Sequence, residues 1–393
     1  MISFQLSEND KKVLEQVRKE ALVCREYARY YDENEHEFPP DELPEAKDFP
    51  ELYAMLGGRG KEDSGMGVIS MLLSAGQTWG DYSVRMRRPG GGGLGNAALR
   101  AAGTLEQQEK WRDLTLAMAI TEPGCGSDPS LVATTAVLDE DTHEWVLNGE
   151  KIFVTTGCRA EGVVVWATVD RAAGRAGIKS FLVEKGTPGF VVAHKEKKLG
   201  IRADDTAAYV FRDCRIPREN LLGGKEEVVQ KGSGGFKGVM KTFNMTRPAV
   251  AAIGLGMAEA ALDFTREQLE AAGVRIEYGP GVHGQSAAAQ RFLELEATFE
   301  AAMLTVLRAA WLADHGKPNN LESSICKAKA GSAVREITQG CIELLGPMGV
   351  SREHLLEKWF RDVRITDIYE GTGQIQNLII ARTILGYGRE QLK

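Results

Sequence analysis

The chain has little of several features that define whole classes of protein. Its six cysteines are scattered over 393 residues, and no two have the C-x-x-C spacing of a redox or zinc motif. No window holds the roughly 18 uninterrupted apolar residues of a membrane-spanning helix. These absences disfavour a disulfide framework, a cysteine zinc site and a membrane protein. We expect the thiols to be reduced.

The chain also lacks an excess of basic residues. Lys and Arg number 48 and Asp and Glu 55, which leaves a net charge of −7. This balance supports solubility and disfavours binding to a nucleic acid, although it allows a local basic patch for a phosphorylated cofactor. The first 16 residues are charged almost at once and have no apolar segment of the kind that a secretory signal needs. We therefore expect a cytoplasmic protein whose partners include no membrane and no nucleic acid.

Several common catalytic motifs are missing as well. The histidines have no H-E-x-x-H spacing and no serine lies in a G-x-S-x-G turn, so neither a metal site nor a serine hydrolase is predicted. Residues 90–95, GGGGLG, formally match the dinucleotide fingerprint G-x-G-x-x-G. The preceding residues 82–89 do not have the pattern of a buried strand, and helix follows. A loop between helices is the better interpretation of these glycines.

The order of predicted elements is helical, then β, then helical. Apolar residues recur with a helical period over 7–31, where Ser7 and Asp10 resemble a capping pair. Helical pattern continues to about 118 after a proline-rich stretch. Seven short runs rich in Val, Phe and Thr follow without helices between them, which indicates an antiparallel barrel or sandwich. These runs are 132–138, 144–147, 151–155, 163–169, 180–183, 190–194 and 208–212, with a turn predicted at Asn148–Gly149. Long helices are predicted near 248–272, 286–315 and 322–345.

Two motifs near the start of the β region could hold a ligand. Residues 119–128, AITEPGCGSD, predict a tight loop whose free N–H groups and hydroxyls could hold an electron-rich ring or a phosphate. Residues 149–157, GEKIFVTTG, predict a strand that places Phe153 and Thr155 on one face, which suits a flat heteroaromatic group with a polar edge. Taken alone, the first motif could be an ordinary turn and the second a half-buried strand with a core phenylalanine.

A third motif lies near the end of the chain. Residues 367–376, DIYEGTGQIQ, place a single carboxylate, Glu370, among apolar residues and glycines. The residue could be a solvated charge at a helix end or a base in a dry pocket.

Five segments, taken in order, resemble the acyl-CoA dehydrogenase family. They are MAITEPGCGSD at 118–128, NGEKIFVTTG at 148–157, LGIRADDTAAYVFRDCRIPRENLLG at 199–223, FNMTRPAVAA at 243–252 and RDVRITDIYEGTGQIQNLIIAR at 361–382. The resemblance implies an α+β multi-domain fold. Its parts would be an N-terminal helical domain over 1–116, a central antiparallel β-barrel domain over 117–225 and a C-terminal helical bundle over 226–393.

The resemblance implies an enzyme that uses FAD to remove the hydrogens α and β to the carbonyl of an acyl-CoA thioester, leaving a trans-2-enoyl-CoA. Glu370 matches the base that takes the α-proton. Such a base must be desolvated so that its pKa rises, and the developing enolate needs preorganised donors. The resemblance assigns these donors to the Glu370 N–H and a flavin ribityl hydroxyl, and sends the β-hydrogen as hydride to flavin N5. Gly371 would leave room for the thioester.

Binding roles follow from the same resemblance. The residues implied for FAD are Ile120, Thr121, Ser127, Phe153, Thr155, Gly346, Thr372 and Gln374, together with Arg275 and Tyr278, which would contact the FAD of a neighbouring subunit. The residues implied for the acyl-CoA are Ser127, Asn244, Arg247, Tyr369 and Gly371. A homotetramer and an electron-transfer flavoprotein, or a similar acceptor, are the implied partners.

Some positions depart from the family pattern or leave a choice open. Glu343 stands near the expected adenine-diphosphate site, where a carboxylate would repel a pyrophosphate. At Arg85 the chain resembles glutaryl-CoA dehydrogenases, in which an arginine at this place is implied to hold the distal carboxylate of the substrate. A dicarboxylic acyl group is therefore one hypothesis. The alternative is that Arg85 belongs to a solvated basic run with Arg87 and Arg88.

Three further hypotheses about function stay open. The chain could be an oxidase or monooxygenase of the same fold, an enoyl-CoA reductase, or a flavin- or nucleic-acid-binding relative without turnover. Monooxygenase relatives lack the glutamate base, so Glu370 counts against that activity. Glu370 and the negative net charge both count against a relative without turnover.

Overall fold

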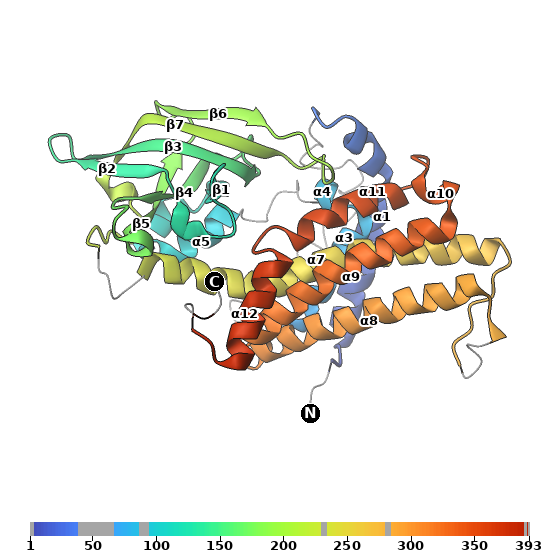
Figure 1. Cartoon of the computed structure of the whole chain (residues 1–393). Coiled ribbons are helices and arrows are strands. Elements are labelled where there is room, and N and C mark those ends of the chain that lie inside the picture. The colour runs from blue at the N-terminus through green and yellow to red at the C-terminus, as the bar shows by residue number, and fades with distance from the viewer. Residues whose placement is uncertain are drawn as a thin grey trace. The chain divides into compact units, whose positions relative to one another are not determined.

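The computed structural model describes residues 4–37, 67–85, 94–228, 234–279, 284–388 and 391, except for the side chains of 85 and 234–245. Contacts divide the chain, drawn in Figure 1, into two compact units. The first contains Met1–Pro89, Lys198–Ala203 and Asn244–Lys393, and the second contains Gly90–Lys197 and Asp204–Phe243. The domain boundaries drawn at 116/117 and 225/226 stay predictions.

The first unit is built from helices. The capping box predicted at Ser7 is confirmed, because its hydroxyl accepts from the Asp10 N–H at 3.1 Å while its own N–H donates to the Asp10 carboxylate at 3.2 Å. The three long helices predicted in the C-terminal part are also confirmed, with ends within a few residues except for an earlier start of α7. The elements are α1 (Glu8–Glu33), α3 (Val68–Gly80), α4 (Tyr82–Arg85), α7 (Gly234–Ala271), α8 (Ala287–Asp314), α9 (Asn320–Leu345), α10 (Pro347–Val350), α11 (Leu356–Asp362), η6 (Val363–Asp367) and α12 (Gly373–Leu385). The part of α7 that belongs to this unit begins at Asn244.

One apolar core holds these helices together. Leu255 of α7, Phe292 of α8 and Val334 of α9 are fully buried within it. A Cβ on Gly256 would lie 2.1 Å from the Ala75 carbonyl oxygen, so only glycine lets α7 and α3 approach this closely. Among the described residues, Thr246–Ala271 of α7 is the one segment long and apolar enough to span a membrane, and 72% of its most apolar window is buried inside the protein.

The second unit carries a seven-stranded sheet, drawn in green in Figure 1. Its order is β1-β4-β2-β3-β7-β6, with β5 also paired to β4. Strands β1 and β2 both run parallel to β4, whereas the remaining pairs are antiparallel. The elements are α5 (Leu94–Ala102), α6 (Leu105–Lys110), β1 (Leu116–Ala119), β2 (Thr135–Asp139), β3 (Glu144–Thr155), β4 (Gly162–Thr168), β5 (Ile178–Glu184), β6 (Phe190–Lys195) and β7 (Thr206–Pro217).

The prediction of a purely antiparallel barrel was therefore wrong, because the sheet is mixed. Strand β1 was not predicted, because it has only four residues, LAMA, and no alternating pattern. Its parallel pairing with β4 requires a long crossover, and the β2–β3 hairpin lies within that connection.

The turn predicted at Asn148–Gly149 was also wrong. These residues lie inside β3, where the register against β7 shifts between Leu147 and Gly149. Gly149 has φ +151°, and a Cβ there would lie 2.5 Å from the Thr134 hydroxyl. The Asn-Gly pair makes a bulge that bends one long strand, and the hairpin turn falls earlier, between β2 and β3.

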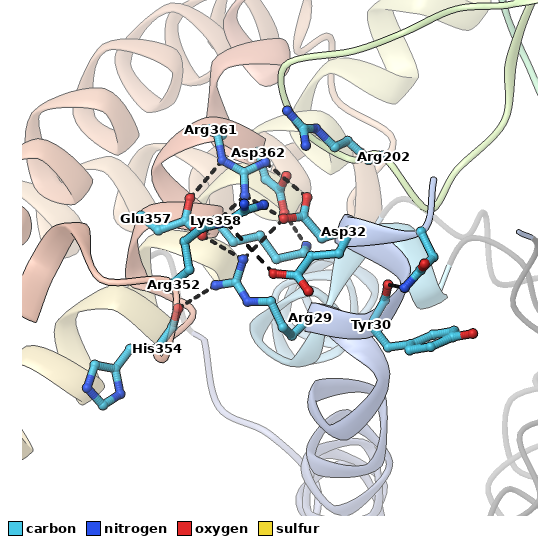
Figure 2. Close-up of polar contacts among 12 residues, drawn as sticks. Arg29, Tyr30, Asp32, Arg202, Arg352, His354, Glu357, Lys358, Arg361 and Asp362 are labelled. Carbon is cyan, nitrogen blue, oxygen red and sulfur yellow. Dashed lines mark hydrogen bonds and ion pairs between the residues drawn. The ribbon is translucent and has the colours of Figure 1, made fainter. Parts of the chain in front are cut away.

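A buried lysine joins three separate parts of the first unit, and its contact with Asp362 is drawn in Figure 2. The Lys358 ammonium of α11 donates to Asp362 at 2.6 Å and also to Asp81, and all three side chains are at most 1% exposed. Asp362 accepts the Ile201 N–H at 2.6 Å with its other oxygen. Burial alone would lower the pKa of Lys358, but Asp362 and Asp81 outweigh this effect and raise it. The lysine is therefore held charged between two carboxylates.

A second set of ion pairs connects α11 to α1 beside this lysine (Figure 2). Arg361 makes a bidentate contact with the buried Asp32, at 2.9 Å and 2.6 Å, and a further contact with Glu357 at 2.8 Å. Arg29 donates to Glu357 at 2.7 Å and to the His354 carbonyl oxygen at 2.5 Å. Bidentate arginine pairs fix orientation as well as distance, so the position of α11 on α1 is defined.

Replacing Lys358 with methionine should destabilise the protein strongly. The two carboxylates would stay buried without a compensating charge, and breaking a buried ion pair typically costs about 3–5 kcal/mol. Thermal and urea unfolding would measure the loss. Lys11→Met is the matched control, because Lys11 is an exposed lysine of α1 paired only with Glu8, and such pairs contribute about 0–1 kcal/mol. Equal stability of the two variants would contradict this account.

Candidate active site

Glu370 lies in a strained turn between η6 and α12. Its φ is +55°, an unusual value for a residue with a side chain, and the following Gly371 has φ +94°. Thr372 then caps α12, with its hydroxyl accepting the Ile375 N–H at 3.3 Å. A left-handed non-glycine residue costs about 1–3 kcal/mol and persists where its surroundings require it, so the turn is a candidate functional site.

The Glu370 carboxyl group is surrounded by protein although part of the residue is accessible. The Thr246 hydroxyl of α7 donates to its Oε2 atom. Burial raises the pKa of Glu370, and the Thr246 hydrogen bond and the nearby charges of Lys327 and Arg247 oppose this effect only in part. The sequence left open whether Glu370 is a solvated charge or a base in a dry pocket, and this environment favours the base.

Arg247 packs beneath this carboxylate. Its side chain is 5% exposed and donates to the Ser324 hydroxyl of α9 at 3.3 Å. Burial lowers the pKa of Arg247, and the charge of Glu370 opposes the change. Contact between Arg247 and the CoA chain stays a prediction, and in the structure the charge of Arg247 favours the ionised form of Glu370.

Other predicted residues of the first unit are distributed along it. Tyr369, Gly371, Thr372 and Gln374 belong to the Glu370 turn or the first turn of α12. Arg275 and Tyr278 lie past the end of α7, and both are exposed.

The remaining predicted site residues lie near a helix end or have side chains outside the described part of the chain. Gly346 ends α9 with φ +54°, and the exposed Glu343 accepts from Gln339 at 2.9 Å. The side chains of Asn244 and Arg85 lie outside the described part of the chain. The ligand roles of all these residues stay predictions.

In the second unit, a buried ion pair joins the two motifs that the sequence singled out. Glu122 accepts from the Lys151 ammonium at 2.7 Å and from the N–H groups of Ala133 and Thr134 at 2.6 Å and 3.0 Å. The same ammonium donates to the Ile120 carbonyl oxygen at 3.0 Å. Burial would raise the pKa of Glu122, but Lys151 and the other donors lower it. The ion pair therefore fixes the loop against β3.

The strand beside this loop turns a phenylalanine outward. Phe153 is 61% exposed and has φ +56°, and the register of β3 against β7 shifts between Lys151 and Val154, which are both buried. Simple alternation does not hold across this irregularity, and the alternative of a core phenylalanine was wrong. Thr156, with φ +62°, adds a second strained residue.

The surface around Phe153 fits a flat heteroaromatic group. The Thr121 carbonyl oxygen accepts the Ile152 N–H at 2.9 Å, so the loop runs directly alongside the strand. Ile120, Thr121 and Thr155 are half-buried there, and Ser127 is exposed on the same loop. An exposed aromatic ring, an aliphatic side chain and hydroxyl groups match a ring system with a polar edge, as in a flavin.

Two family models match the chain. One, described as "Acyl-CoA dehydrogenase, C-terminal domain", covers residues 233–385, and the other, "Acyl-CoA dehydrogenase, middle domain", covers 117–214. The chain is 37% identical to acryloyl-CoA reductase (NADH) of Anaerotignum propionicum over 294 residues, which are 73% of this chain and 72% of that protein. The chain belongs to the acyl-CoA dehydrogenase family.

Further comparisons extend the likeness over nearly the whole chain. Identity to the short-chain specific acyl-CoA dehydrogenase of Clostridium acetobutylicum is 32% over 385 residues, 93% of this chain and 98% of that protein. Butyryl-CoA dehydrogenase from Megasphaera elsdenii superposes with a TM-score of 0.80 at 28% identity, covering 98% and 100% of the two chains. The protein is thus an FAD-binding oxidoreductase that acts on acyl-CoA.

Three side chains of these two candidate regions, one in each unit, were not assigned from the sequence. Thr246 lies in the quoted motif FNMTRP and went without a role, and so did Glu122 in EPGCGSD. Lys327 had a signal that could have found it. It lies among small residues on the buried face of α9, which include Ser323, Ser324, Ala330 and Gly331, where a lysine needs a reason to be buried.

Removing the Thr246 hydroxyl should shift the pH dependence of the enzyme. The hydroxyl donates to the ionised carboxylate and lowers its pKa, so Thr246→Val should raise the pKa of Glu370 further. A base must be unprotonated, and the acid limb of the rate of flavin reduction by butyryl-CoA should therefore move to higher pH. Thr298→Val, a half-buried threonine of α8 bonded to its own helix, is the control. An unmoved acid limb would contradict this assignment.

Proposed function

We propose that this protein dehydrogenates an acyl-CoA thioester between its α and β carbons, with Glu370 as the base. The observation that carries the proposal is the Glu370 carboxyl group, buried by protein, raised in pKa and held on a strained turn. A thioester α-proton is only weakly acidic. A carboxylate with a raised pKa is a stronger base for it than a solvated one.

The turn around Glu370 supports the second requirement of the reaction. Negative charge develops on the thioester oxygen as the α-proton leaves, and a fixed donor stabilises it. The backbone N–H of Glu370 is proposed as this donor. Gly371 has no side chain to obstruct a thioester next to that backbone, and the positive φ values at 370 and 371 set the direction of the peptide groups.

FAD, when bound, supplies the acceptor for the β-hydrogen as hydride. Phe153, Ile120, Thr121 and Thr155 are proposed to hold its ring, and Ser127 to contact ring or substrate. Glu122 and Lys151 keep the loop and the strand together under these residues. Thr372, Gln374 and Gly346 are proposed at its adenine side, with Arg275 and Tyr278 serving a neighbouring subunit.

The substrate is proposed to be a short acyl-CoA. Relatives that cover most of the chain are named short-chain specific acyl-CoA dehydrogenase and butyryl-CoA dehydrogenase. Asn244, Arg247 and Tyr369 are proposed along the thioester and CoA chain. A relative named acryloyl-CoA reductase (NADH) favours a second candidate, the reverse reduction of an enoyl-CoA. The retained base serves both directions, since it returns the α-proton in the reduction.

The partners and the location follow as parts of the same proposal. An electron-transfer flavoprotein or a similar acceptor is proposed to take the electrons. A homotetramer is proposed because exposed residues past α7, among them Tyr278, would complete the FAD site of another subunit. The cytoplasm is the proposed location, in line with the negative charge and the free thiols.

Glu370→Gln should lower the rate at which butyryl-CoA bleaches the bound flavin. Glutamine keeps the size of the side chain but cannot accept the proton, and losing a general base costs about 10²–10⁴-fold in rate. Stopped-flow absorbance would measure the bleaching without an added electron acceptor. Glu300→Gln removes an exposed carboxylate of α8 that has no proposed role in binding or catalysis, and it should leave the rate unchanged. Undiminished bleaching in Glu370→Gln would overturn the assignment of the base.

Arg85→Ala tests whether the acyl group carries a distal carboxylate. If Arg85 pairs with it, the variant should lose at least about tenfold in kcat/KM for glutaryl-CoA, because charge-assisted pairs contribute about 1.5–3 kcal/mol. The kcat/KM for butyryl-CoA should change little. Comparing both substrates in wild type and variant separates this effect from general damage. Arg88→Ala, in the same basic run, is the control. Equal losses on both substrates, or none, would favour the solvated run.

A further inference from the structure

Two buried donors converge on one carbonyl oxygen next to Glu370. The Lys327 ammonium of α9 donates to the Gly371 carbonyl oxygen at 3.1 Å. The Gln376 side-chain amide of α12 donates to the same oxygen, also at 3.1 Å. Neither side chain is exposed to solvent. A buried lysine loses its hydration, and the hydrogen bond to this carbonyl oxygen offsets part of that free-energy cost.

This contact fixes the part of the backbone that carries the base. Glu370 and Gly371 both have positive φ, a conformation that a free peptide adopts rarely at glutamate. A Cβ on Gly371 would lie 2.5 Å from the Gln376 amide nitrogen, so glycine is needed for the amide to reach the carbonyl. Lys327 is 44 residues away in sequence and holds the turn from a different helix.

Charged groups from three neighbouring segments act on the Lys327 ammonium. Asp367 of η6 and Glu370 attract it, and Arg247 of α7 repels it. Asp367 is itself 3.8 Å from Arg335 of α9. Burial, the largest effect, lowers the pKa of Lys327 to about 8. Its charge in turn favours the ionised form of Glu370.

We propose that Lys327 is a positioning residue for the dehydrogenation, which holds the Glu370–Gly371 turn so that the carboxylate and the Glu370 N–H face the thioester together. This inference rests on the proposed function of Glu370. Lys327 acts through the turn and through its charge, and it transfers no proton to or from the substrate. A structural lysine elsewhere in the core would affect folding, whereas this one should affect the chemical step.

Lys327→Met should separate the chemical step from binding. We expect the limiting rate of flavin reduction by butyryl-CoA to fall about 10²-fold, the scale of effect of a misplaced reacting group. The dissociation constant for the substrate and the FAD content should stay within about threefold of wild type. The acid limb of the pH profile should also move upward, because a cation that favours ionised Glu370 is gone. Lys329→Met, an exposed lysine on the same helix, is the matched control.

Two further measurements keep the inference falsifiable. If Lys327→Met does not yield flavin-bound protein, Lys327→Gln replaces it, because glutamine is polar but one bond too short to keep the contact with Gly371. A limiting rate within twofold of wild type, in whichever variant binds FAD, would overturn the role of Lys327. If Glu370→Gln also retained full bleaching, the proposed function itself would fail. If Glu370→Gln were inactive while the Lys327 variants were normal, only this inference would fail.

Discussion

A lysine buried between two carboxylates anchors α11, the short helix that leads to the Glu370 turn. Lys358 of α11 is bonded to Asp362 on its own helix and to Asp81 at the end of α3. The same helix is held to α1 through Arg361 and Asp32. The helix is followed at once by η6 and then by the Glu370 turn. Glu370 thus lies eight residues after Asp362, one of the two carboxylates that hold Lys358 (Figure 2).

The network also explains why a short segment between β6 and β7 belongs to the helical unit. Ile201 donates its N–H to Asp362 at 2.6 Å, and the Leu199 carbonyl oxygen accepts from Arg361 at 2.9 Å. Ile201 has φ +44°, an uncommon value for a β-branched residue. A Cβ on Gly200 would lie 2.6 Å from the Arg361 backbone, so the segment lies directly against α11. Its strain is offset by hydrogen bonds to the same two residues that anchor the helix.

The sequence predicted much of the fold because helix signals are local. The helical period and the Ser7 capping box gave α1, and the long apolar periods gave α8 and α9. The predictions that failed concern features that depend on distant residues or on the local backbone conformation. The pairing of β1 with β4 depends on a partner 46 residues away, and Asn148–Gly149 has the composition of a hairpin turn but forms a bulge. No local pattern distinguishes these outcomes.

The same division holds for the site. Glu370 and the two candidate ligand motifs, 119–128 and 149–157, were singled out from their residues together with the family resemblance. The alternation of side chains along a strand did not predict that Phe153 points outward, because its positive φ interrupts the period of two. The partners of Glu370 also come from distant helices, Thr246 and Arg247 from α7 and Lys327 from α9. A single sequence shows such residues but not what they face.

Two buried lysines of the first unit, Lys358 and Lys327, differ in what compensates their loss of hydration, and their pKa values shift in opposite directions. Lys358 has two carboxylates in direct contact, which outweigh burial and raise its pKa. Lys327 has a carbonyl oxygen in contact and its carboxylates farther away, so burial dominates and its pKa falls to about 8. Desolvation acts on both, and the difference lies in whether a full charge or a dipole compensates it. A lysine held by a dipole stays sensitive to a nearby carboxylate, and Glu370 is the carboxylate whose charge changes when it takes a proton.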